Sequence, residues 1–63
     1  MNDRLRILLI DDDLASQRVL AASLGRSGDA VDPAADLATA RVAARSRSYD
    51  LVVCDARLLR GGL

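Results

Sequence analysis

Aspartates follow two short apolar runs in this chain. A triplet at residues 11–13 comes directly after the apolar run 7–10, and Asp55 comes directly after the run 51–54. If these carboxylates meet, two of them about 4 Å apart repel by roughly 4 kcal/mol at an effective dielectric constant near 20, so the group needs a cation or a proton. Oxygen ligands of this kind suit Mg²⁺, which takes one or two carboxylates and keeps positions for water and phosphate.

The two apolar runs have the pattern of buried strands. Each is too short for a helix, and its unbroken apolar character is typical of a strand buried on both faces of a parallel sheet. The carboxyl ends of parallel strands lie along one edge, where open α/β sheets bind their ligands. We therefore expect the acidic groups behind both runs to converge on one site.

A helix is predicted directly after the triplet. It covers about residues 14–24, buries Leu20 and Leu24, and is ended by the glycines that follow. Asp13 is its natural N-cap, because the side chain can accept a hydrogen bond from the free amides of the first turn. We favour this capping role for Asp13 over metal binding.

The following segment predicts a weak strand and a second helix. The strand should be short, near Ala30 and Val31, and should lie at an edge of the sheet because Pro33 cannot donate a ladder hydrogen bond. The helix should run from its N-cap Asp36 to about Arg45.

The alternation of strand, helix, strand, helix and strand indicates an α/β protein. Right-handed connections between parallel strands give a partial doubly wound, flavodoxin-like sheet of three strands in the order 2-1-3, with two helices on opposite faces. In this topology Asp11, Asp12 and Asp55 lie at the same end of the sheet.

Composition limits the possible functions. The chain has 63 residues, nine of them Arg and nine Asp, so its formal charge is zero and no broad basic field attracts nucleic acid or an anionic membrane. The single Cys54 cannot form an internal disulfide and is expected to be a small buried side chain. No apolar stretch is long enough for a signal peptide or a membrane span, so we expect a cytoplasmic protein.

The chain resembles the receiver domain of two-component response regulators over its whole length. The resemblance rests on the acidic pair after the first strand, on Gly28 before the second, on the turn into the second helix, and on the last strand with its acid. The corresponding residues are Asp11 and Asp12, Gly28, Ala34, Ala35, Asp36 and Ala40, and the segment 49–55.

The resemblance implies a role for each residue of the acidic site. Asp55 would be the phosphoacceptor, taking a phosphoryl group from a sensor histidine kinase or a phosphotransfer protein. Asp12 would bind Mg²⁺ directly, Asp11 would hold it through water, and the backbone carbonyl of Arg57 would complete the site together with Asp55. Such a protein is a phosphoacceptor and not an enzyme, apart from weak self-phosphorylation.

The chain also departs from the family. Leu59 stands where the family usually has Pro, and the glycine that ends the same loop is displaced to Gly61 and Gly62. The strands that carry a phosphate-binding Ser or Thr and a Lys are missing, and the chain contains no Lys. We therefore expect residues 1–63 to be a truncated receiver domain that is inactive alone and self-associates through the exposed edge of its third strand.

Three alternatives remain open. The acids could merely cap helices and solvate strand ends, although capping does not explain Asp55. The triplet also matches the Asp-x-Asp motif of haloacid dehalogenase-type phosphatases, in which Asp11 would be the nucleophile and Asp13 the acid/base, but Ala15 stands where that family has Thr or Val. A degenerate receiver would keep the fold and bind partners without phosphorylation.

Overall fold

Strands and helices alternate along the chain. The computed structural model describes residues 4–59. Its elements, with two short 3-10 turns included, are β1 (Arg6–Ile10), α1 (Leu14–Leu24), η1 (Gly25–Ser27), β2 (Ala30–Ala34), α2 (Leu37–Ser46), β3 (Leu51–Cys54) and η2 (Ala56–Leu59).

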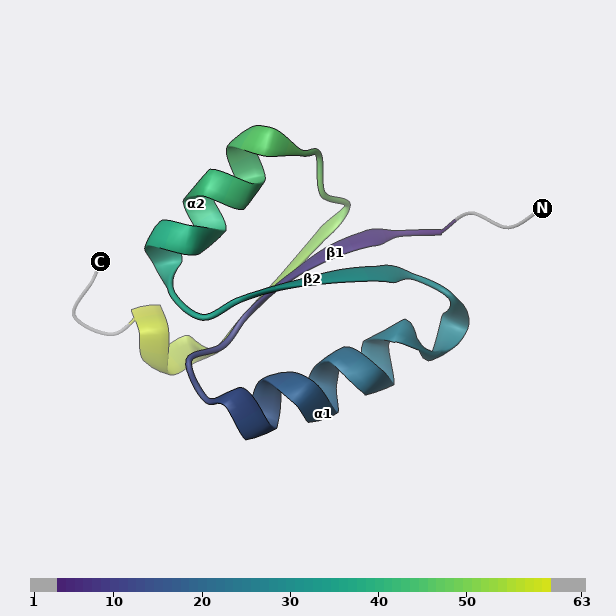
Figure 1. The fold of residues 1–63 in the computed structure, drawn as a ribbon, viewed down its shortest axis with the longest axis horizontal. Helices are drawn as coiled ribbons and strands as arrows, with labels where there is room; N and C mark the ends of the chain where they lie inside the picture. Colours follow the sequence, from purple (N-terminus) through teal and green to yellow (C-terminus); the bar gives the residue numbers. More distant parts are fainter. Residues whose placement is uncertain (1–3, 60–63) are drawn as a thin grey trace.

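The three strands form one parallel sheet in the order β2-β1-β3. The helices α1 and α2 lie on opposite faces of this sheet (Figure 1). The prediction of a partial doubly wound sheet with strand order 2-1-3 and two helices is confirmed. Its physical basis is the right-handed crossover, which sends the chain to the opposite face when the direction of strand addition reverses.

The core is built around β1, the central strand. Ile7, Leu8, Leu9 and Ile10 are at most 5% exposed, because β1 has a strand on each side and a helix on each face. Side chains alternate between the two faces of a strand, so Leu8 and Ile10 face α2. There they pack with two small buried residues, Ala34 and Ala40, and with partly buried neighbours that include Tyr49 and Cys54.

Helix α1 is less buried than its sequence predicts. No residue of α1 is buried, and Leu20 is 39% exposed, so the expected burial of Leu20 is wrong. The helix packs against β1 and β2. Since α1 contacts only these two strands of the sheet, part of its apolar side stays exposed to solvent.

Strand β2 is longer than predicted. It has five residues and continues through Pro33 to Ala34. Ala30 donates to the carbonyl of Leu5 and Ala34 accepts from Asp11, so these two residues direct their backbone groups toward β1. Backbone groups alternate in direction along a strand, so the nitrogen of Pro33 lies on the outer side of an edge strand, where no donor is needed.

A left-handed glycine connects α1 to β2. Gly28 has φ of 88°, a conformation that side-chain-bearing residues rarely adopt, and its N–H donates to the carbonyl of Gly25 at 3.0 Å.

Gly61 and Gly62, where the sequence departs from the loop pattern of the receiver family, lie outside the described residues. Among residues 4–59, no helix combines the length and the apolar character needed to cross a membrane.

Candidate functional site

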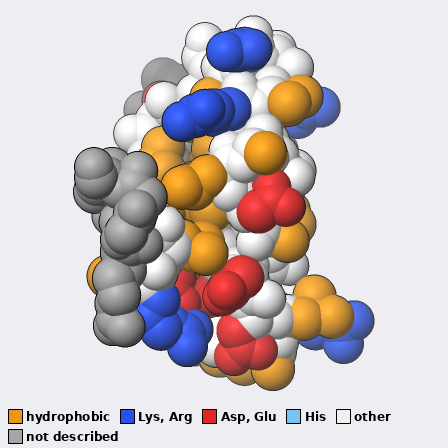
Figure 2. Space-filling model, turned by 90° about the vertical axis from the view of Figure 1, so that its left-hand side faces the viewer, with side chains coloured by type: hydrophobic (Ala, Val, Ile, Leu, Met, Phe, Trp, Pro, Cys, Tyr) orange, Lys and Arg blue, Asp and Glu red, His pale blue; other side chains and the backbone are white. Residues whose placement is uncertain are grey.

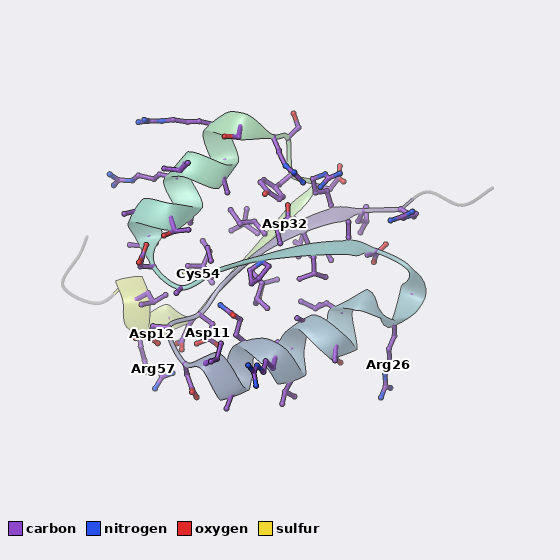
Figure 3. The ribbon with its side chains drawn as sticks, viewed as in Figure 1. Asp11, Asp12, Arg26, Asp32, Cys54 and Arg57 are labelled. Carbon is purple, nitrogen blue, oxygen red and sulfur yellow. The ribbon has the colours of Figure 1, made fainter. Side chains whose placement is uncertain are left out.

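Three carboxylates lie together at the carboxyl end of the sheet. Asp11 and Asp12 follow β1 and Asp55 follows β3, and one carboxylate oxygen of each lies within 4.8 Å of the others. Figure 3 shows Asp11, Asp12 and Arg57 at the same end of the molecule. We call Asp11, Asp12 and Asp55 the acidic cluster.

Backbone hydrogen bonds hold two members of the acidic cluster in place. The N–H of Asp55 donates to the carbonyl of Ile10 at 3.0 Å, and the N–H of Asp11 donates to the carbonyl of Ala34 at 3.0 Å. These bonds continue the pairing of β1 with β3 and of β1 with β2 by one step beyond the strands. The sheet therefore determines where Asp11 and Asp55 lie, whereas Asp12 follows in the loop before α1.

The three carboxylates differ in exposure. Asp11 is 4% exposed, and its Oδ1 accepts from the backbone N–H of Asp13 at 3.0 Å. The side chain of Asp55 is 18% exposed and that of Asp12 is 56% exposed. The acidic cluster thus runs from a buried, hydrogen-bonded carboxylate to one that faces solvent, and a cation from solvent can reach it at Asp12.

Arg57 in η2 binds directly to Asp55. Its Nη2 donates to Oδ2 of Asp55 at 2.6 Å, and its Nε donates to Oδ2 at 3.0 Å and to Oδ1 at 3.3 Å. The backbone N–H of Arg57 donates to Oδ1 of Asp55 at 3.0 Å. These donors, the side chain first and the backbone second, lower the pKa of Asp55 from its ordinary value.

The family resemblance implies a role in the site only for the backbone carbonyl of Arg57, whereas the structure also brings the Arg57 side chain onto Asp55. Its Nη2 also lies 4.0 Å from Oδ1 of Asp12, so the guanidinium extends from one carboxylate toward the next. Acidic and basic side chains are in contact on this face of the molecule (Figure 2). An Arg two residues after Asp55 is the signal that could have indicated the pair, since η2 folds back on the acid.

Asp13 and Asp36 lie outside the acidic cluster and cap helices. Asp13 is the N-cap of α1, with Oδ1 accepting from the N–H of Ala15 at 3.3 Å and Oδ2 accepting from the hydroxyl of Ser16 at 2.7 Å. Asp36 is the N-cap of α2 and accepts from the N–H of Thr39 at 2.7 Å, which lowers the pKa of Asp36.

Cys54 is a free, partly buried thiol. It packs against the apolar residues between the sheet and α2, and its Sγ lies 3.5 Å from the carbonyl oxygen of Asp55. This environment is that of a small core side chain, in keeping with the structural interpretation of Cys54.

The donor set of the acidic cluster fits a hard divalent cation. All the side-chain ligands are carboxylate oxygens, which are preferred by Mg²⁺ and Ca²⁺, and no sulfur or imidazole is offered by these three residues. The exposed Asp12 can adjust its side chain to the octahedral geometry that Mg²⁺ demands, while the buried Asp11 supplies a fixed ligand.

No protein-family model matches this chain, and no curated protein or solved structure matches it significantly. The assignment of a function therefore depends on the fold and on the geometry of the acidic cluster.

Proposed function

We propose that this chain is a phosphoacceptor module of the receiver type, in which Asp55 accepts a phosphoryl group with Mg²⁺ held by the acidic cluster. The observation that supports this most directly is that β1 and β3 bring Asp11, Asp12 and Asp55 together at the carboxyl end of a parallel sheet with the order β2-β1-β3. This is where open α/β sheets bind ligands. Helix capping accounts for Asp13 and Asp36, but it does not explain why Asp11, Asp12 and Asp55 lie together.

Asp55 is the nucleophile of the proposed reaction. A lone pair of one carboxylate oxygen forms the new O–P bond while the P–N bond of a phosphohistidine breaks. The bonding pair returns to the imidazole nitrogen, and the product on Asp55 is an acyl phosphate. The ordinary pKa of an Asp carboxyl, about 4, already keeps Asp55 in the anionic form that this attack needs throughout the neutral range.

Asp11, Asp12 and the carbonyl of Arg57 would hold the cation, as the family resemblance implies. Mg²⁺ bound there would supply charge neutralisation for the phosphoryl oxygens. The main contribution of the protein is to position the reacting groups, since the backbone hydrogen bonds of Asp11 and Asp55 fix where these two residues lie relative to each other.

The proposed partner is a sensor histidine kinase or a phosphotransfer protein, which supplies the phosphohistidine. The chain is then a substrate of its partner rather than an enzyme, and we expect it to act in the cytoplasm. Nothing in its balanced charge favours nucleic acid.

A phosphatase of the haloacid dehalogenase type is less well supported. In that mechanism Asp13 must exchange protons with the substrate, but both its carboxylate oxygens accept hydrogen bonds at the start of α1. A degenerate receiver that only binds partners has the same fold and differs in whether Asp55 reacts.

Phosphorylation by a small donor tests the proposal. The purified chain is incubated with Mg²⁺ and radiolabelled acetyl phosphate, and hydroxylamine-sensitive label is located by mass spectrometry. We expect a trace of label on Asp55, because the chain has no Lys and each missing preorganised donor can reduce the rate by roughly 100- to 1000-fold. Appending the second half of a receiver domain should raise the labelling.

The variants separate the alternatives. Asp55→Asn should abolish the label, and Asp50→Asn, which can keep the hydrogen bond that Asp50 accepts from the N–H of Arg6, should not. A label that is lost in Asp11→Asn but kept in Asp55→Asn would support the phosphatase. A folded, extended protein that binds Mg²⁺ and takes no label would support the partner-binding module.

A further inference from the structure

The guanidinium of Arg57 occupies the atoms of Asp55 that a cation or a phosphorus atom would need. An ionised carboxylate has about four lone-pair sites for hydrogen bonds. In Asp55, three N–H···O contacts come from the Arg57 side chain and one comes from the Arg57 backbone. Both oxygens of Asp55 are therefore engaged by one residue, and a ligand can reach them only by displacing Arg57.

The contact between Arg57 and Asp55 lies at the protein surface, where it can break. The side chain of Arg57 is 62% exposed, whereas that of Asp55 is 18% exposed, so the guanidinium approaches the carboxylate from the solvent side. Ion pairs with an exposed partner are weak in water, because the released charge is readily solvated.

The position of the guanidinium also matches that of a competing cation. Its Nη2 is 2.6 Å from Asp55 and 4.0 Å from Asp12, so its charge lies between two of the three carboxylates. A divalent cation shared by the same carboxylates would be repelled by Arg57 at this distance. The guanidinium and a divalent cation would therefore compete for Asp55.

We propose that Arg57 is an internal competitor of the divalent cation: its guanidinium covers Asp55 and must leave before the acidic cluster can bind a cation through Asp55. This inference rests on the proposed function and adds a determinant of cation affinity to the same site. Arg57 thereby raises the Mg²⁺ concentration at which the nucleophile becomes accessible.

Affinity for Mg²⁺ alone tests the competition. The dissociation constant is measured by amide chemical shifts in the wild-type chain, in Arg57→Ala, in Arg57→Lys and in Arg26→Ala. Arg26 lies at the opposite end of the molecule, so its removal changes the net charge equally without touching the acidic cluster (Figure 3). We expect Arg57→Ala to bind Mg²⁺ on the order of fivefold more tightly than the wild type, and Arg26→Ala to bind like the wild type.

Arg57→Lys distinguishes the direct contact of the guanidinium with Asp55 from the long-range effect of the positive charge. Lys keeps the charge but loses the planar fork that binds both oxygens of Asp55. Displacement of a bidentate contact predicts an affinity close to that of Arg57→Ala, whereas a long-range field predicts an affinity close to that of the wild type. The second result would overturn the proposal.

The Nε–H resonance of Arg57 gives a second, direct measurement in the wild-type chain. We expect a protected signal without Mg²⁺ that loses its protection as the cation binds. A signal unchanged at saturating Mg²⁺ would overturn the proposal, and so would equal affinities in the wild type and Arg57→Ala. If no variant binds Mg²⁺, the cation site of the proposed function fails together with this inference, whereas equal affinities overturn the inference alone.

Discussion

The hydroxyl of Tyr49 donates a hydrogen bond to Oδ2 of Asp32 at 2.7 Å. Asp32 lies in β2 and Tyr49 lies just before β3, so the bond connects the two edge strands across β1. The same oxygen lies 3.5 Å from a guanidinium nitrogen of Arg6 and 3.5 Å from one of Arg47. This polar contact complements the apolar packing between the sheet and α2.

The Tyr49–Asp32 bond predicts a pH-dependent stability. Donation by Tyr49, followed by the charges of Arg47 and Arg6, lowers the pKa of Asp32. A carboxyl with a lowered pKa stabilises the fold above its unfolded value of about 4, and this stabilisation is lost as the pH falls through the folded value. We expect Tyr49→Phe to lower the free energy of unfolding at pH 7, and the difference from the wild type to shrink below about pH 4. A difference that stays constant down to pH 2, measured by urea denaturation, would contradict this origin.

Binding of Mg²⁺ should depend on Asp12. We expect a titration to move the amide resonances near Asp12 and Asp55 at millimolar Mg²⁺, on the order expected for a site with few ligands. Asp12→Asn should weaken binding by about tenfold or more, because it removes one charge and one ligand oxygen. Asp36→Asn is the matched control, since Asn also caps a helix and Asp36 lies outside the acidic cluster. Equal weakening in both variants would indicate a non-specific charge effect.

Asp13 should contribute to stability through its cap. Asp13→Ala removes the acceptor for the N–H of Ala15 and should lower the free energy of unfolding by about 1 kcal/mol. Asp13→Ser keeps an acceptor and should be close to neutral. Thermal denaturation followed by circular dichroism measures both. If Asp13→Ala left stability unchanged but abolished phosphatase activity, Asp13 would have the acid/base role instead.

Strand β3 should mediate self-association. Among residues 4–59 it pairs with β1 alone, and its residues Leu51 and Val52 are 43% and 55% exposed. Unpaired apolar edges bind other strands, and charged side chains on an edge oppose this. We expect the wild-type chain to sediment as concentration-dependent oligomers and Val52→Lys to shift it toward the monomer.

Val42→Lys serves as the control for the edge. Val42 is 64% exposed on α2, away from the strand edge, so the same change of charge should leave the oligomers in place. A wild-type monomer with a sharp unfolding transition that does not depend on concentration would show that β3 does not associate.

Local signals in the sequence determined most of the fold. The apolar run 7–10 became the buried strand β1, Asp13 and Asp36 became N-caps, and α1 ends at Leu24 as expected. These features depend on residues a few positions apart, whose backbone geometry and hydrogen bonds are set by their neighbours. The strand order follows from the alternation of elements, because the handedness of crossovers leaves few topologies.

The tertiary structure alone decided the features that depend on distance in space. The spacing of two residues lets Arg57 reach Asp55, but the position of its Nη2 4.0 Å from Asp12 as well depends on β1 and β3 lying side by side. Pairing with β1 allowed β2 to continue through Pro33. Asp32 meets Tyr49 although 17 positions separate them, because β2 and β3 pair with the two sides of the same central strand, β1. Such contacts depend on side-chain direction after packing, which no spacing along the chain encodes.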